Sequence, residues 1–218
     1  MPVNNSLNEE KINGQINKYE NLVFAGGGTK ALAFLGVLKY FDDHNMLKHF
    51  KKVIGSSAGA LTAMLFACGL NSEQIKNAIL ELPMSDMKDD DIGIIRDTGR
   101  FINEFGYYKG ERLEVEIGNI LEKYMGDSNI NFNNLYKKTG IELTVTLTCV
   151  DKAETWYANY STEPDMEVKK AVRISMSIPW AFASVKYKGY RFCDGGVYDN
   201  FPIDYWDNKK MANIIQKL

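Results

Sequence analysis

Apolar and polar positions along the chain follow two different periodicities. Continuous apolar or β-branched runs at 19–25, 52–54 and 142–150 are typical of buried strands. Segment 29–44 has apolar residues at helical spacing and predicts an amphipathic helix, whereas segment 58–68 is apolar on almost every side and predicts a fully buried helix. We expect further helices at 72–80, 111–124, 132–138 and 166–176, and further strands at 155–160, 185–187 and 190–193.

The order of these elements indicates the fold class. Strands and helices alternate along most of the chain, which is the pattern of an α/β sandwich with a mainly parallel central sheet. The first residues are polar and rich in Asn, so we expect residues 1–19 to form a flexible extension. The remaining residues, 20–218, are expected to form one domain.

Composition narrows the function classes. The 218 residues include 26 basic and 28 acidic side chains, a formal net charge of -2, which argues against a nucleic-acid binder because such proteins are normally basic. The N-terminal residues have no apolar core like that of a signal peptide, and the most apolar stretches are too short to span a bilayer. We therefore expect a cytoplasmic protein or one peripheral at membranes.

A glycine–serine turn follows the predicted strand at 52–54. Residues 55–59 read Gly-Ser-Ser-Ala-Gly and fit the pattern G-x-S-x-G between a strand and a helix. In that context the serine occupies a sharp, strained turn, and Gly55 and Gly59 relieve the crowding. The helix dipole beginning at Ala58 favours negative charge at Ser57. The alternative is a chance glycine–serine turn; with two further motifs beside it, we favour Ser57 as a nucleophile.

The second motif is the run Gly26, Gly27 and Gly28, followed by Lys30, again between a strand and a helix. Consecutive glycines let backbone N–H groups point into a site without side-chain obstruction, and Lys30 adds a positive charge nearby. Such a loop binds either a phosphate or the oxyanion of a tetrahedral acyl intermediate. A plain strand-to-helix turn is the alternative interpretation.

The third motif is Asp194 with Gly195 and Gly196, directly after the predicted strand at 190–193. By itself it is a common turn sequence. Its interest comes from the histidine count: the chain has two histidines, His44 and His49, and both precede Ser57. The conventional catalytic triad that accompanies a G-x-S-x-G turn runs in the order Ser, acid, His, so its histidine comes last in the chain. A carboxylate is the remaining option as the base, and Asp194 is the best-placed candidate.

The three motifs, in this order, resemble the patatin-like phospholipases. Shared features are the strand followed by Gly-Gly-Gly-x-Lys, the G-x-S-x-G turn, and the Asp-Gly-Gly block continued as Asn200-Phe201-Pro202. Segment 174–182 is similar to the family's sequence before that block, so the resemblance covers roughly residues 19–202. Departures are Lys30 where arginine is frequent, Ala31 where glycine is usual and Ser177 where alanine is usual.

The resemblance implies a three-layer α/β/α sandwich and a lipid acyl hydrolase of the phospholipase A or lysophospholipase type. By that resemblance Ser57 is the nucleophile, Asp194 is the base, and Gly26 to Gly28 form the oxyanion loop. The implied partners are a membrane phospholipid or other lipid ester as substrate, with transient contact at the membrane surface. The chemistry needs no metal and no cofactor.

Two other functions remain open from the sequence. The glycine run, continued by Lys30 and Ala31, also fits a dinucleotide-binding pattern, but the next strand runs into Gly55 without the acidic residue that would hold a ribose. A non-catalytic lipid-binding domain is the other alternative. An inert descendant tends to lose its nucleophile or its base, and Ser57 and Asp194 are both present.

The periodicity weakens between residues 83 and 110. This stretch combines weak patterning with five large apolar or aromatic side chains, namely Phe101, Ile102, Phe105, Tyr107 and Tyr108. We expect either a mobile gate that helps the protein to meet lipid surfaces or a partly ordered loop with these side chains packed inward.

Overall fold

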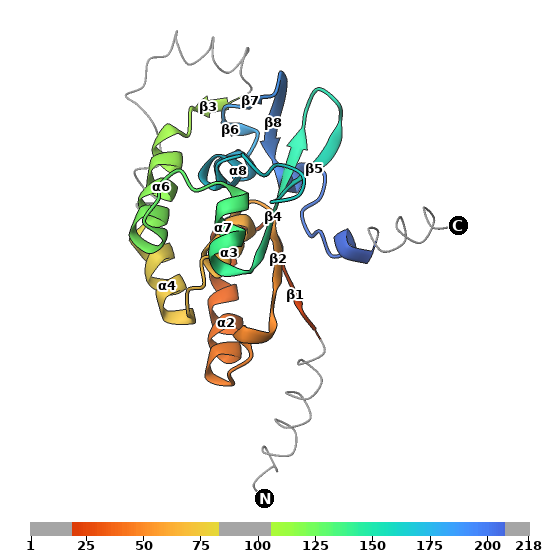
Figure 1. Cartoon of the computed structure of the whole chain (residues 1–218). Coiled ribbons are helices and arrows are strands. Elements are labelled where there is room, and N and C mark those ends of the chain that lie inside the picture. Colours follow the sequence, from red (N-terminus) through yellow and green to blue (C-terminus); the bar gives the residue numbers. More distant parts are fainter. Residues whose placement is uncertain (1–18, 83–105, 208–218) are drawn as a thin grey trace, which may run out of the picture.

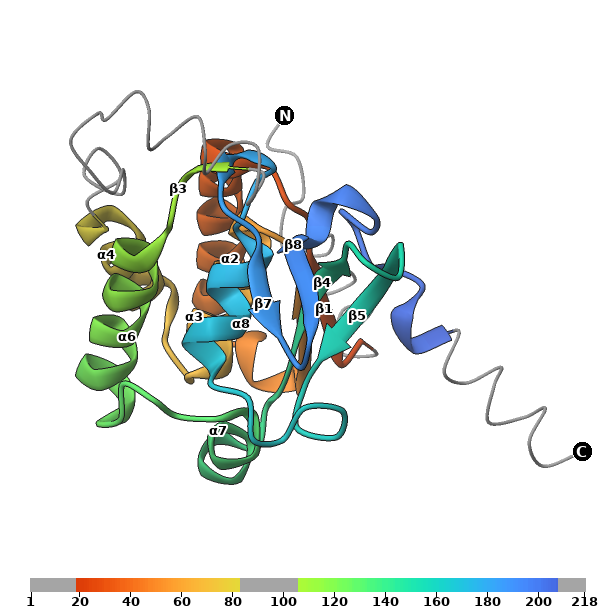
Figure 2. The same ribbon diagram turned by 90° about the horizontal axis from the view of Figure 1, so that it is seen from above.

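The computed structural model describes residues 19–82 and 106–207. In these ranges helices pack on one face of a six-stranded sheet (Figure 1 and Figure 2). The helices are α2 (Ala33–Asp43), α3 (Ala58–Ala67), α4 (Ser72–Glu81), α6 (Glu111–Met125) and α8 (Val168–Ser175), with α7 (Phe132–Thr139) leading into the long central strand. The expected elements are therefore present, with bounds that differ by at most two residues except at α2, which begins four residues later than expected.

The sheet is mixed, with most strands in one direction. Strands β1 (Asn21–Phe24), β2 (Lys52–Gly55) and β4 (Glu142–Cys149) form successive parallel pairs. Strands β5 (Glu154–Ala158) and β8 (Tyr190–Asp194) pair antiparallel with β4, and β7 (Val185–Tyr187) pairs antiparallel with β8. Hence β1, β2, β4 and β7 share one direction and β5 and β8 oppose it, in agreement with the expected mainly parallel sheet.

Two strands share one edge of β4 and run toward each other along it. Residue Val145 pairs with Gly55 of β2 and also with β5, so β2 and β5 lie on opposite edges of β4. Residue Leu147 pairs with Asp194 of β8 and also with β5, so β8 lies on the same edge as β2. The carboxyl ends of β2 and β8 therefore meet head-on, about 7 Å apart along β4.

The core lies between the sheet and its helical layer. Every residue from Gly59 to Ala67 in α3 is buried, which confirms the prediction of a helix apolar all round. In β4 every residue from Leu143 to Cys149 is buried, because helices cover one face and later segments cover the other. The site described below lies at one end of α3, so it is attached to the best-packed part of the molecule.

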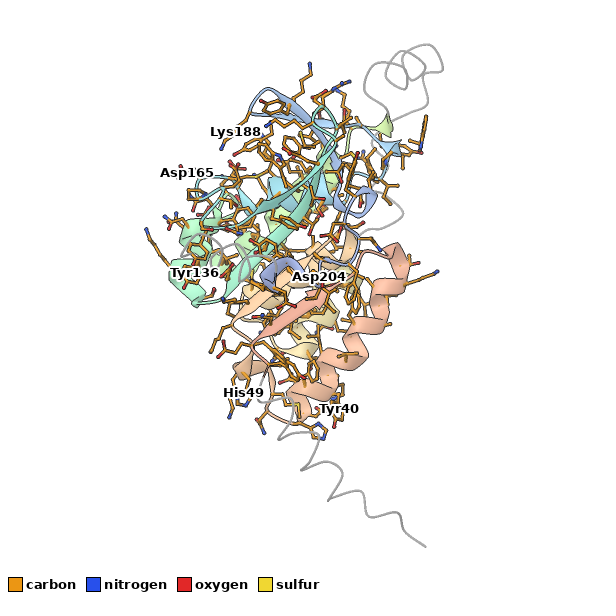
Figure 3. All side chains as sticks on the ribbon, turned by 90° about the vertical axis from the view of Figure 1, so that its right-hand side faces the viewer. Tyr40, His49, Tyr136, Asp165, Lys188 and Asp204 are labelled. Carbon is orange, nitrogen blue, oxygen red and sulfur yellow. The ribbon has the colours of Figure 1, made fainter. Side chains whose placement is uncertain are left out.

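The opposite face of the sheet carries segment 200–207 (Figure 3). There Tyr205 is buried and accepts a hydrogen bond at its hydroxyl from Asn159 Nδ2, at 2.8 Å. Its ring also packs on Tyr157 of β5, with ring centroids 4.5 Å apart. Helices, mixed sheet and this outer segment give the α/β/α architecture expected from the sequence.

The structure adds elements that the sequence pattern did not indicate. Strands β3 (Gly106–Tyr108) and β6 (Trp180–Phe182) form a separate two-stranded parallel sheet. The expected helix at 29–44 begins as a short 3-10 turn, Gly28–Leu32, before α2. Residues 1–18 of the predicted extension at 1–19, and residues 83–105 of the predicted gate at 83–110, lie outside the described residues.

Candidate active site

Ser57 lies in the sharp turn between β2 and α3. Its backbone angles are φ 54 and ψ -126, an unfavourable region for a residue with a side chain. Such a conformation costs about 1–3 kcal/mol and persists only where the surroundings enforce it. A Cβ on Gly55 would lie 2.2 Å from the Gly59 carbonyl oxygen, and one on Gly59 would lie 2.3 Å from the Phe24 oxygen. Both glycines are therefore required by close backbone packing.

The meeting of β2 and β8 brings Ser57 and Asp194 together. The Ser57 hydroxyl donates to Asp194 Oδ2 at 2.8 Å, although 137 residues separate the two. Ser57 is 7% exposed and Asp194 is 5% exposed, so little water competes for this hydrogen bond. A hydroxyl directly bonded to a buried carboxylate is a geometry in which the carboxylate can remove the hydroxyl proton.

Burial raises the pKa of Asp194 above its ordinary value, since water no longer solvates the charge. Two hydrogen bonds oppose this effect, one from the Ser57 hydroxyl and one from the Gly196 N–H to Oδ1 at 2.8 Å. A carboxylate with a raised pKa is a stronger base than a solvated aspartate. Burial therefore makes Asp194 a better proton acceptor for Ser57 than a solvated aspartate would be.

Gly195 and Gly196 fit Asp194 closely into this corner. A Cβ on Gly195 would lie 2.1 Å from the Thr146 carbonyl oxygen of β4. One on Gly196 would lie 2.5 Å from Asn200 Oδ1 and 3.0 Å from Asp194 Oδ1. The Asp-Gly-Gly sequence is thus explained by space, because any side chain at these positions would displace Asp194 or its neighbours.

The glycine loop is anchored beside Ser57 by its first residue. The Gly26 N–H donates to the Asn200 carbonyl at 3.0 Å, and Asn200 Nδ2 donates to the Gly26 carbonyl at 3.1 Å. A Cβ on Gly26 would lie 3.1 Å from Ser57 Cβ, so the loop passes close to the serine. Among the described residues, nothing accepts a hydrogen bond from the N–H groups of Gly27 and Gly28.

Of the four residues expected to form the oxyanion loop, Gly26 and Lys30 therefore differ from Gly27 and Gly28. Gly26 uses its N–H to hold the loop in place, so that group is not available to a ligand. The Lys30 side chain is exposed, and in the described part of the chain no contact joins it to Ser57 or Asp194. Gly27 and Gly28 are the members of the run whose donors are open.

Ser57 lines an apolar cavity of about 420 Å³. Its neighbours Gly28 and Ala58 line the same cavity. The walls come from four helical segments, β3 and the 176–182 segment, and the main apolar contributors are Leu61, Ile79, Leu82, Leu113, Met176 and Phe182. A mainly apolar cavity with a few polar groups in its lining is suited to an apolar ligand that carries a polar group.

Sequence reasoning missed two groups that the geometry brings to the site. Ser175, the last residue of α8, accepts a hydrogen bond at its hydroxyl from the Ser57 N–H at 2.9 Å. The Ala58 N–H lies at the start of α3, and no described residue accepts a hydrogen bond from it. The position directly after Ser57 was a usable signal for Ala58; no local pattern marked Ser175, which lies 118 residues away.

The two histidines lie at the other end of β2. His49 precedes this strand and Ser57 follows it, while His44 ends α2 and stacks on Tyr40 with ring centroids 4.1 Å apart. Figure 3 labels His49 and Tyr40 together at one end of the molecule, far from Lys188. The chain has no other histidine, so no histidine is placed to assist Ser57.

Two negative findings apply to the described ranges. No helix there is both long and apolar enough to cross a membrane. No cluster of three or more His, Cys, Asp or Glu side chains there is arranged to hold a metal ion.

Comparisons with known proteins agree with this fold. The chain is 28% identical over 198 residues to a probable lipid hydrolase of Invertebrate iridescent virus 6, covering 88% of the chain and 66% of that protein. It is 30% identical over 215 residues to the YqhO protein of Bacillus subtilis, covering 90% and 70%. The crystal structure of VipD from Legionella pneumophila superposes with a TM-score of 0.64 at 18% identity, covering 84% of this chain and 47% of VipD.

The viral and bacterial relatives are similar in sequence, and VipD is similar in fold. The chain spans about two thirds of the length of the viral relative. A family model, described as patatin-like phospholipase, matches residues 22–207, a range that contains the glycine loop, the Ser57 turn and the Asp-Gly-Gly block. Because that match takes in most of the sequence and all three motifs, the chain belongs to the patatin-like phospholipase family.

Proposed function

We propose that the protein hydrolyses acyl esters of lipids with Ser57 as nucleophile and Asp194 as base. The observation that carries this proposal is the 2.8 Å hydrogen bond from Ser57 to Asp194, with Ser57 in the lining of an apolar cavity. The strained turn at Ser57 supports it, because strain of this kind is common at catalytic residues. The proposed catalytic domain begins at residue 20.

In the first half of the reaction, Asp194 accepts the hydroxyl proton while Ser57 Oγ bonds to the ester carbonyl carbon. The carbonyl oxygen becomes an oxyanion. We assign its stabilisation to the open N–H groups of Gly27 and Gly28, joined by the Ala58 N–H at the positive end of the α3 dipole. Gly26 holds this loop against Asn200, and Lys30 contributes only a positive charge near the entrance.

Collapse of the oxyanion breaks the bond to the alcohol, which leaves with the proton that Asp194 held. The acyl group is then bonded to Ser57. In the second half, Asp194 takes a proton from a water molecule, and the resulting hydroxide attacks the acyl carbon. The proton returns to Ser57 as the fatty acid departs, which restores the starting state.

The cavity and its entrance suggest how a lipid would reach Ser57. The acyl chain would lie along the apolar walls, with its ester at Ser57. Three of the lining side chains are large, apolar and exposed: Leu80 at 62%, Ile178 at 48% and Leu32 at 46%. Such residues are compatible with transient contact at a lipid surface.

Structural features count against the two alternative functions. A dinucleotide site needs the N–H groups of the glycine loop for phosphate, but Gly26 donates to Asn200 and the adjoining cavity is apolar. A lipid-binding domain without catalysis has no use for a strained serine bonded to a buried carboxylate. We therefore retain hydrolysis as the proposed function.

The test combines covalent labelling with a lipid panel. We expect a fluorophosphonate probe to label the wild-type protein and not Ser57→Ala. Hydrolysis of vesicle phospholipids, lysophospholipids and neutral lipids, followed by mass spectrometry of released fatty acid, should fall by about 10³-fold or more in that variant. Flotation of the inactive variant with the same vesicles measures surface contact. Wild-type hydrolysis by folded Ser57→Ala would refute the assignment.

A further inference from the structure

The hydroxyl of Ser175 connects α8 to the Ser57 turn. It accepts a hydrogen bond from the Ser57 N–H at 2.9 Å and donates one to the Thr146 carbonyl at 2.7 Å. Ser175 and Thr146 have no exposed surface, so water cannot replace either bond. Both functions of this hydroxyl, acceptor and donor, are therefore in use.

These bonds act on the strained part of the backbone. On its carboxyl side Ser57 is held by α3, where its carbonyl accepts from the Ala60 N–H at 2.9 Å. On its amino side, the Ser57 N–H bond to Ser175 fixes the orientation of the peptide plane that precedes Ser57. Relaxation of the Ser57 φ from 54 to a favourable negative value requires either the peptide plane before Ser57 or the one after it to turn. With both fixed, the strained conformation is retained.

The same helix end also holds the partner of Ser57. The Asp194 N–H donates to the Ser177 carbonyl at 2.9 Å, two residues beyond Ser175. The backbone of Ser57 and the backbone of Asp194 are thus both bonded to residues 175–177. This short stretch fixes the separation of two residues that come from opposite ends of the sequence.

We infer that Ser175 is a positioning residue for Ser57. Its hydroxyl keeps the Ser57 turn in the conformation that directs Oγ toward Asp194 and the cavity. Ser175 is fully buried, so it acts through Ser57 and does not touch substrate. This inference rests on the proposed function and adds a residue that the three sequence motifs do not contain.

The main test is Ser175→Ala in the full chain, measured on a soluble short-chain ester. We expect kcat to fall by about 10- to 100-fold with KM within about twofold, since misplacement of a reacting group lowers the chemical step. The rate of fluorophosphonate labelling should fall in parallel. Ser175→Thr keeps the hydroxyl and should restore kcat to within about threefold of wild type; a Thr variant as slow as Ala would overturn the inference.

Ser72→Ala is the matched control for lost stability. Ser72 is also a buried serine, and its hydroxyl donates to Asp42 at 2.7 Å, but it lies at the start of α4 away from the site. The Ser72→Ala substitution should lower the melting temperature and leave kcat unchanged. If Ser175→Ala does not fold, Ser175→Cys keeps the size and substitutes a weak donor and acceptor, and a clear loss of kcat is expected there too.

The outcomes separate the inference from the function on which it rests. If Ser57→Ala still hydrolyses the ester, the proposed function fails whatever Ser175 does. If Ser57→Ala is inactive while a folded Ser175→Ala or Ser175→Cys turns over at the wild-type rate, the inference about Ser175 is overturned and the proposed function stands.

Discussion

Two glycine-containing turns meet at Ser57, and they are held in different ways. In the turn at 55–59, a Cβ on either glycine would lie within 2.4 Å of backbone atoms. In the loop at 26–28, a Cβ on Gly27 would meet nothing closer than 3.6 Å, and one on Gly28 would meet nothing within 4 Å. The first turn is fixed by packing over its whole length, whereas the loop is anchored mainly at Gly26.

The difference shows that one residue type serves two physical needs. In the turn, glycine is required because there is no room for a side chain. At Gly28 the requirement is the positive φ of 55, together with open space through which a ligand can approach the backbone. A buried rigid turn suits a nucleophile, and an exposed loop with open N–H groups suits the stabilisation of a transient charge.

The largest effect is expected from Gly59→Ala. Its Cβ would lie 2.3 Å from the Phe24 oxygen and 2.6 Å from the Ala25 oxygen, so β1 and α3 must separate. We expect a loss of about 3–5 kcal/mol in the free energy of unfolding, measured with urea. Gly69→Ala is the control, because a Cβ there meets nothing within 4 Å; its positive φ of 78 alone should cost about 1 kcal/mol. Equal losses would contradict the packing argument.

Next in size is Asp194→Asn, which leaves the turn intact and removes the proposed base. Turnover should fall by about 10³-fold or more, because Asn cannot accept the proton. In the wild type, activity should decline as pH falls through the raised pKa of Asp194, so this acid limb should lie above the ordinary aspartate value of 3.8. A folded variant that hydrolyses lipid at the wild-type rate would require another base.

The same substitution carries a prediction about stability. Because the folded-state pKa of Asp194 is raised, the protonated carboxyl favours folding, and that contribution is lost as pH rises through the folded pKa. At neutral pH the buried charge therefore lowers stability, and Asp194→Asn should unfold at the same or a higher temperature than wild type. The difference should shrink in acid; a difference that grows in acid would reverse the sign.

A smaller effect is expected from Gly28→Ala in the open loop. The new side chain meets no neighbour, but the positive φ should cost about 1 kcal/mol of stability. Turnover should fall by about tenfold or less, since the N–H is retained. Gly26→Ala, whose Cβ would lie 2.3 Å from Asn200 Oδ1, should cost more in both assays. The reverse order would mean that the loop is not anchored at Gly26.

The smallest effect is expected when both histidines are replaced, in His44→Gln with His49→Gln. Both precede β2 in the sequence, so they lie at the opposite end of this strand from Ser57. We expect kcat to change by less than about twofold, and partly exposed substitutions of this kind usually alter stability by about 0.5 kcal/mol or less. A large fall in kcat for the folded double variant would bring a histidine back into the mechanism.

Local sequence was sufficient for most of the helices and strands and for the turn at Ser57. The apolar stretch of α3 and the flanking glycines are local features, and packing turns them into a buried helix and a strained turn. The proximity of Asp194 depends instead on register. Strand β8 is antiparallel to β2 and meets it head-on along β4, so the two residues come together only in the folded sheet. No local pattern encodes that meeting.

Other parts of the site are also consequences of tertiary structure. The pairing of β3 with β6 joins two three-residue strands that are too short to be recognised by periodicity. Ser175 reads as an ordinary residue at a helix end, and its bond to Ser57 appears only when α8 packs beside α3. The loss of Gly26 as an available donor depends on Asn200, a residue that the sequence suggested only as part of a family motif.

The bonds between Gly26 and Asn200 join positions 174 residues apart, and this has a consequence for synthesis. A ribosome makes the glycine loop and the Ser57 turn early, but Asp194 and Asn200 only near the end of the domain. A nascent chain therefore carries the proposed nucleophile long before it can acquire either the proposed base or a fixed loop. Enzyme activity should begin only once almost the whole domain has left the ribosome, and shortened translation products should have none.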